Sequence, residues 1–141
     1  MITATRKIHF CAGHRVFEHE SKCATLHGHN YIAWVTVEAP ELDTLGRVVD
    51  FSCIKQLVGD WIDLYWDHNT IVYHKDITVL EGLMNMPRKK DPFVMHENPT
   101  AENMASFLLN TVCPEVFAGS EVKAIKIELY ETENCKVEVT L

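Results

Sequence analysis

The chain has 141 residues, of which 13 are basic and 20 acidic, a formal net charge of -7 at neutral pH, and 47% hydrophobic residues. This balance excludes a disordered or fibrous chain, and the negative charge argues against nucleic acid or an anionic membrane as a partner. No stretch approaches the roughly 20 apolar residues of a membrane-spanning helix, so we expect one globular domain, 1–141, with no membrane partner.

The cysteines indicate the compartment. They are five in number and scattered, they form no Cys-x-x-Cys pair, and the N-terminal residues lack the apolar core of a signal peptide. We therefore expect free thiols in a reducing, cytoplasmic environment.

The first two patterned segments predict a pair of strands. Residues 3–14 and 27–38 alternate between inward and outward side chains, as a half-buried strand does. The inward rows are Ile8, Phe10, Ala12, His14 and, in the second strand, His27, His29, Tyr31, Ala33, Val35, Val37. Three histidines therefore stand at the ends of two inward rows.

Two helices follow, separated by a long connection. Ser52 is the expected N-cap of the first helix, and Thr100, after a proline, is the expected N-cap of the second, which Pro114 should end. Residues 71–98 show no period and are expected to be irregular. The apolar stripes that predict the helices are Ile54, Leu57, Val58, Trp61, Ile62, Tyr65 and then Met104, Leu108, Leu109, Val112.

Two more alternating segments close the chain. Residues 121–131 alternate, with the inward row Ile125, Ile127, Leu129 and Glu131, and 136–141 follow as a short strand. The order strand, strand, helix, helix, strand, strand predicts an α+β fold with a four-stranded antiparallel sheet and both helices on one face. Its edge strands and open face are hidden if subunits join edge to edge into a β-barrel, so we expect a homo-oligomer.

The histidines have the pattern of a metal site. His27 and His29 point to the same side of one strand, and His14 can add a third nitrogen from its neighbour. Three neutral imidazoles suit zinc and leave a fourth position open, as in catalytic sites. Any one of them alone fits an ordinary hydrogen-bonded pocket histidine, but three together favour a metal.

The polar loop between the first two strands carries Cys23 and is long enough to fold over the histidines. Two roles remain open for this thiol. It is either a fourth zinc ligand that closes the site, or a base or nucleophile beside the metal, where a nearby cation lowers the pKa of a thiol.

Three further sets of polar residues each have two possible roles. Asp67 and His68 form either a proton-transfer couple or a helix-ending turn. Glu131 is costly to bury unpaired, so it faces a ligand's N–H groups unless it is a solvated strand end. The basic run 88–90 holds phosphate or is a solvated loop.

The motifs "FCAGHR", "CATLHGHNY", "DHN", "ENPTAEN" and "YETENC" together resemble the 6-pyruvoyltetrahydropterin synthase family along essentially the whole chain. The short Cys-x-x-x-His-Gly-His spacing is most similar to the bacterial 6-carboxytetrahydropterin synthase branch of queuosine (7-deazapurine) biosynthesis. The resemblance implies a tunnelling fold, in which three sheets join as one barrel, two trimers stack as a hexamer, and active sites lie between subunits.

The resemblance also implies roles. It matches zinc ligands to His14, His27 and His29, catalytic groups to Cys23, Asp67 and His68, and pterin contacts to Glu131 and Thr100. The Asp67–His68 couple would come from a neighbouring subunit. Proximity alone suggests Arg15, Lys22 or the 88–90 run for a triphosphate.

The implied substrate is 7,8-dihydroneopterin triphosphate. It would lose triphosphate and, in the carboxy-forming branch, also acetaldehyde, to give 6-carboxy-5,6,7,8-tetrahydropterin. The pyruvoyl-forming activity is the alternative within the family. A non-catalytic, zinc-stabilised pterin-binding module is the alternative of another class.

Overall fold

The computed structural model describes residues 1–141 and contains the predicted antiparallel sheet. β1 (Thr3–His14) pairs along its whole length with β2 (His27–Glu38), β2 pairs with β5 (Lys123–Thr132), and β5 pairs with β6 (Cys135–Thr140). The two predicted hairpins and their joining in one sheet are confirmed. The α+β class and the inward rows of β1 and β2 are confirmed as well.

Two short strands extend the sheet beyond the four that the sequence predicts. β3 (Asn69–Tyr73) lies parallel to β1, and β4 (Phe93–Met95) lies parallel to β3, giving the order β4-β3-β1-β2-β5-β6. The prediction of an irregular segment 71–98 is therefore wrong, and this segment also contains α3 (Ile77–Met84). Short parallel strands are buried on both faces, as the buried neighbours Ile71 and Val72 are, so they show no alternation.

The first long helix runs through α1 (Phe51–Ile54), a π-helical turn and α2 (Asp60–Tyr65). Its N-cap is Asp50, whose carboxylate accepts the Ser52 N–H at 2.8 Å, so the prediction of Ser52 as the cap is wrong by two residues. Both residue types are good caps, and sequence alone does not separate them.

The second long helix runs through α4 (Ala101–Phe107), a π-helical turn and α5 (Cys113–Val116). Thr100 is the N-cap, as predicted, and accepts the Asn103 N–H at 3.1 Å. Pro114 does not end the helix. It stands in the first turn of α5, directly after the π turn, where a missing N–H is tolerated.

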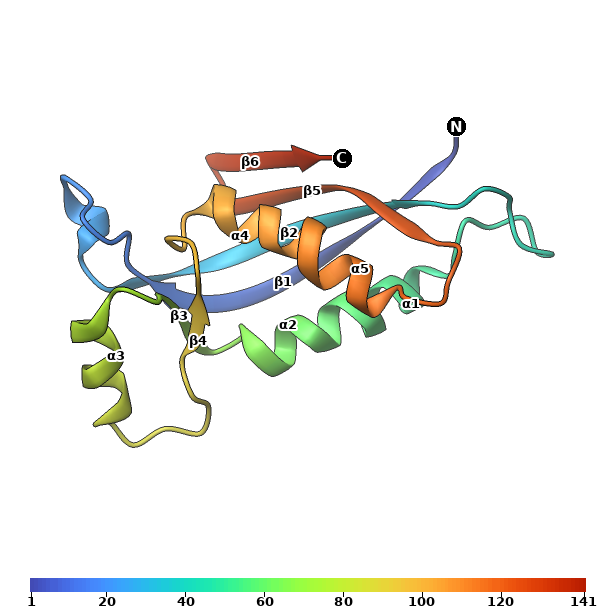
Figure 1. Ribbon diagram of the computed structural model, residues 1–141. Coiled ribbons are helices and arrows are strands. Elements are labelled where there is room, and N and C mark those ends of the chain that lie inside the picture. Colours follow the sequence, from blue (N-terminus) through green and yellow to red (C-terminus); the bar gives the residue numbers. More distant parts are fainter.

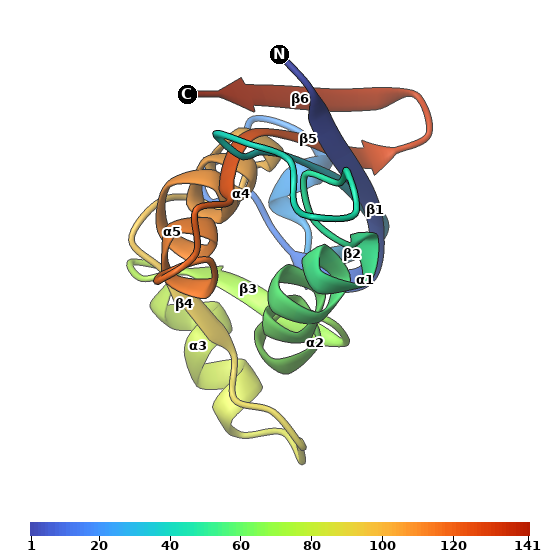
Figure 2. The ribbon, with the colours of Figure 1, turned by 90° about the vertical axis from the view of Figure 1, so that its right-hand side faces the viewer.

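Both long helices cover the same face of the sheet, while α3 stands apart from them (Figures 1 and 2). The core lies between helices and sheet. One predicted row changes, because a bulge between Thr36 and Val37 turns Ala124 inward in place of Ile125. No helix is long and apolar enough to cross a membrane.

Candidate active site

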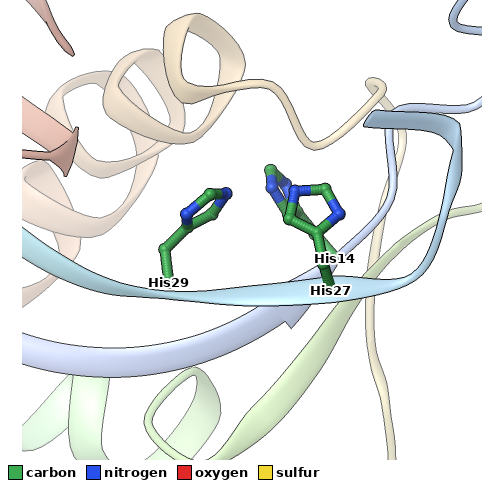
Figure 3. A group of neighbouring side chains, drawn as sticks. All are labelled: His14, His27 and His29. Carbon is green, nitrogen blue, oxygen red and sulfur yellow. The ribbon is translucent and has the colours of Figure 1, made fainter. Parts of the chain in front are cut away.

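The three predicted histidine ligands form one cluster. The register of β1 and β2 pairs His14 directly with His27, and His29 lies two residues further along the same face of β2. One ligand nitrogen from each residue lies within 4.8 Å of the others. Figure 3 shows the three imidazoles on one side of the strands, facing the helices.

Backbone carbonyls orient two of these rings. The Nδ1–H of His14 donates to the Pro99 carbonyl at 2.6 Å, and the Nδ1–H of His27 donates to the Thr25 carbonyl at 2.6 Å. A carbonyl only accepts, so Nδ1 carries the proton and Nε2 of a neutral ring keeps its lone pair. Nε2 of His29 is buried and has no hydrogen-bond partner.

The surroundings of the cluster suit a cation. One Glu131 carboxylate oxygen lies 3.1 Å from Nε2 of His14 and 3.4 Å from Nε2 of His29. A carboxylate stays beside imidazole lone pairs only where a proton or a metal cation compensates them. Burial, with the neighbouring imidazoles, lowers the pKa of His29 despite the opposing effect of Glu131, which favours the neutral ring that binds metal. The residues present therefore fit a divalent metal such as zinc.

Tyr31 extends the cluster and was in the predicted row without a predicted role. Its hydroxyl lies 3.2 Å from Nε2 of His14, and burial raises the pKa of Tyr31, so the hydroxyl keeps its proton. The adjacent His14 imidazole lowers the pKa of Glu131 against the opposing effect of burial. Glu131 thus faces the cluster as a carboxylate.

Cys23 lies in η1 (Lys22–Ala24), a short 3-10 helix between β1 and β2. Its side chain is partly buried, and its carbonyl accepts the Val16 N–H at 2.8 Å. The group of residues within reach of one metal contains the three histidines and does not include Cys23. The structure therefore forms a three-ligand cluster and places the thiol outside it.

The Asp67–His68 couple lies directly after α2. An oxygen of Asp67 lies 3.0 Å from Nδ1 of His68, and the other accepts the Cys11 N–H at 2.8 Å. Partial burial alone raises the pKa of Asp67, but the bonds from Cys11 and His68 outweigh it, so this pKa lies below its ordinary value. The His68 side chain is 78% exposed and free to meet a substrate.

The histidine cluster and the Asp67–His68 couple both border one surface groove. Its walls include His29, Glu131 and Asp67, and an adjoining hollow is lined by His68 and Cys11. Asp67 and His68 bind the backbone N–H and carbonyl of Cys11, so the couple lies at the edge of β1, whereas the three imidazoles stand on one face of the strands (Figure 3). One chain therefore holds both groups without placing them face to face.

Most predicted phosphate contacts are already engaged. Arg15 makes a two-pronged ion pair with the buried Asp76, both bonds at 2.6 Å, which raises the pKa of Arg15. In the 88–90 run, the arginine and the last lysine bind carbonyl oxygens near helix ends. Lys22 and the middle lysine of the run make no hydrogen bond or ion pair in the structure, so they remain the free cations among these candidates.

Thr100 lies next to the cluster, since the preceding Pro99 carbonyl holds His14. Its hydroxyl oxygen accepts the cap hydrogen bond from Asn103, which leaves the hydroxyl proton and a second lone pair for a pterin contact. The carbonyls of Pro99 and Thr25, which sequence reasoning missed, are backbone groups with no residue-type signal.

Comparison with known proteins agrees with this architecture. The profile of the 6-pyruvoyl tetrahydropterin synthase family matches residues 3–141. The chain belongs to this family. The resemblance seen in the sequence motifs is thereby confirmed, and the family together with its named relatives indicates a lyase-type pterin synthase.

Relatives and solved structures add detail. A Rickettsia typhi protein named 6-carboxy-5,6,7,8-tetrahydropterin synthase is 43% identical over 139 residues, covering 99% of this chain and 100% of the relative. An uncharacterised Wolinella succinogenes protein superposes with a TM-score of 0.83 at 23% identity, covering 99% of this chain and 97% of that one. The Caenorhabditis elegans 6-pyruvoyl tetrahydropterin synthase superposes with a TM-score of 0.71 at 22% identity, covering 99% of this chain and 95% of that one. These two structures show the shared fold.

Proposed function

We propose that this protein is a zinc-dependent 6-carboxy-5,6,7,8-tetrahydropterin synthase. It converts 7,8-dihydroneopterin triphosphate and water to 6-carboxytetrahydropterin, triphosphate and acetaldehyde, in queuosine (7-deazapurine) biosynthesis. Support comes from the name of the Rickettsia typhi relative, which is matched over its full length. The profile's own description favours a second candidate, the pyruvoyl-forming reaction.

The observation that carries the proposal is the convergence of three imidazole nitrogens in a chain of this family. His14 and His27 would hold the zinc through the nitrogens that their backbone hydrogen bonds leave free, and His29 through its buried Nε2, which has no hydrogen-bond partner. Bound zinc supplies Lewis-acid polarisation of the substrate's side-chain oxygens.

The other side chains move and hold protons. Cys23 takes a proton from the substrate side chain as a thiolate base. Asp67 fixes the tautomer of His68 through Nδ1, which leaves Nε2 to exchange a proton with the substrate. Glu131, kept ionised, accepts hydrogen bonds from the amino and ring N–H groups of the pterin, and Thr100 adds a contact.

The site is completed by a second copy of the chain. The outer edge of β6 has no partner strand, and Thr3–Phe10 of β1 has no partner strand on the side away from β2, because Cys11 binds Asp67 and His68 and β3 pairs only from Ala12 onward. Edge-to-edge pairing of these strands closes a barrel of three subunits, and two such trimers form the hexamer. The exposed Asp67–His68 couple of one subunit then serves the Cys23 of its neighbour.

The test is to incubate zinc-loaded protein with 7,8-dihydroneopterin triphosphate, with and without chelator, and to identify products by mass spectrometry. Chelator-sensitive release of triphosphate and acetaldehyde with a 6-carboxypterin supports the proposal. A pyruvoyl product assigns the second candidate instead. Zinc binding and pterin binding without turnover would point to a non-catalytic module.

A further inference from the structure

A lysine from a distant loop closes the end of α2. Lys90 Nζ donates to the carbonyl oxygens of Asp63 at 2.5 Å and Asp67 at 2.7 Å. The last carbonyls of a helix lack partners within the helix and attract a cation. Lys90 therefore supplies hydrogen bonds that the helix cannot provide for itself.

The second of these bonds fixes the peptide group that joins Asp67 to His68. Lys90 holds the carbonyl of this peptide, and the Cys11 carbonyl accepts its N–H at 2.6 Å. The bond from the Cys11 N–H then holds the Asp67 carboxylate. The orientation of both members of the couple thus depends on bonds from β1 and from Lys90.

His68 needs such support, because its backbone is in the left-handed region with a φ of 55°. A residue other than glycine is strained in this conformation and keeps it only where its surroundings hold it there. The hydrogen bonds that Lys90 and Cys11 make to the peptide between Asp67 and His68 hold the backbone in this conformation.

We propose that Lys90 is a positioning residue for the Asp67–His68 couple: its ammonium group, bound to the Asp67 carbonyl, sets the direction of the His68 side chain. This inference rests on the proposed function, since it assigns the couple a role in proton transfer. The charge of Lys90 also helps to lower the pKa of Asp67. The titratable groups that face Asp67 are His68 beside it, Lys90 from the 85–92 loop and Cys11 from β1.

The chain offers a control on the same helix as the couple. Lys55 lies in the π-helical turn between α1 and α2 and carries the same charge as Lys90, but its side chain is exposed and it has no role in the proposed site. A change at Lys55 alters the net charge by the same amount without touching the peptide between Asp67 and His68.

The experiment compares zinc-loaded wild type with Lys90→Met, Lys90→Arg and Lys55→Met, measuring kcat, KM and the pH profile of pterin product formation. We expect Lys90→Met to lower kcat roughly 10- to 100-fold with little change in KM. Its acid limb should move to higher pH, because loss of the cation lets the pKa of Asp67 rise. Lys90→Arg should recover most of kcat, and Lys55→Met should match wild type.

A Lys90→Met protein with wild-type kcat and pH profile would overturn the inference, even if its Tm falls, because Lys90 would then be only structural. If wild type itself shows no turnover, the proposed function fails, and the NMR amide signals of His68 and Cys11 test the positioning role by themselves. Signals displaced in Lys90→Met but not in Lys55→Met support positioning, and unchanged signals refute it.

Discussion

The histidine cluster and the Asp67–His68 couple are supported in opposite ways. The register of two fully paired strands brings the imidazoles together, and nearby carbonyls aim two of them. The couple instead stands in a turn with one left-handed residue and is held by a lysine about a sixth of the chain away.

This difference separates metal binding from proton transfer. Strand pairing is distributed over many hydrogen bonds, so the cluster should tolerate changes outside its own residues. The couple depends on a few single contacts, so its geometry should respond to changes at distant positions. The two functions should therefore be separable by mutation.

The largest effect is expected from breaking the cluster itself. His27→Ala removes a ligand that is only partly buried, so the fold should survive while zinc is lost. Zinc affinity should fall by more than the roughly 10- to 100-fold that loss of a supporting hydrogen bond costs, and turnover should go with it. Metal content by mass spectrometry checks this, with exposed His96→Ala as the control. Full zinc content in His27→Ala would refute the three-histidine site.

Cys23→Ala tests whether the thiol belongs with the metal or with the proton-transfer groups. Because the thiol lies outside the cluster, we expect zinc and Tm to stay near wild type while kcat falls by about 10² to 10⁴. The exposed Cys135→Ala is the matched control. Loss of zinc together with stability would instead identify Cys23 as a structural ligand.

Asp67→Asn addresses the couple and should leave zinc in place. The amide cannot fix the His68 tautomer, so we expect kcat to fall by the order of 10², near the lower end for general acid–base catalysis. In wild type the pKa of Asp67 is lowered, so the carboxylate persists through neutral pH and its contribution to activity and stability is lost only as pH falls through that lowered pKa. The variant should lack this acid limb.

Mixed oligomers of the Cys23→Ala and His68→Asn variants test whether the couple acts in its own subunit or in the neighbouring one. If it serves the neighbouring subunit, oligomers refolded from both variants contain some sites with both native groups, and activity should exceed that of either variant alone. Activity that stays at the level of the separate variants would place the couple and Cys23 in one chain.

The sequence predicted the cluster well because alternation within a strand determines which side chains share a face, and a cross-strand neighbour completes the set. His14, His27 and His29 needed only that rule. Asp67 and His68 were identifiable as residue types, but their surroundings were not. Lys90 reaches them from a segment that appeared irregular, because β3 and β4 are short, parallel and too buried to alternate.

Other differences also come from contacts that no local pattern records. The bulge that brings Ala124 inward depends on the partner strand, and the choice of Asp50 over Ser52 as a cap depends on where the chain enters the helix. The Pro99 carbonyl that orients His14 depends on how the segment before α4 lies against the end of β1. Each is a tertiary event between segments distant in the chain or at a helix boundary.

The smallest effect is expected from Gly28→Ala, which tests how far the geometry of the histidine cluster depends on the close approach of β1 and β2. Gly28, between two of the histidines, pairs with Gly13, and a Cβ added to it would meet the Ala12 carbonyl at 3.2 Å. Gly28→Ala should therefore cost about 1 kcal/mol of unfolding free energy and weaken zinc binding slightly, because β1 and β2 must shift by a few tenths of an ångström.

Gly82→Ala in α3 is the control for that substitution, since nothing lies within 4 Å of its added Cβ, and alanine favours a helix. Its Tm should be unchanged or higher, and its zinc affinity should equal that of wild type. If Gly28→Ala behaves in the same way, the strands have room to spare, and the imidazoles owe their geometry to the Pro99 and Thr25 carbonyls rather than to the tight Gly13–Gly28 pair.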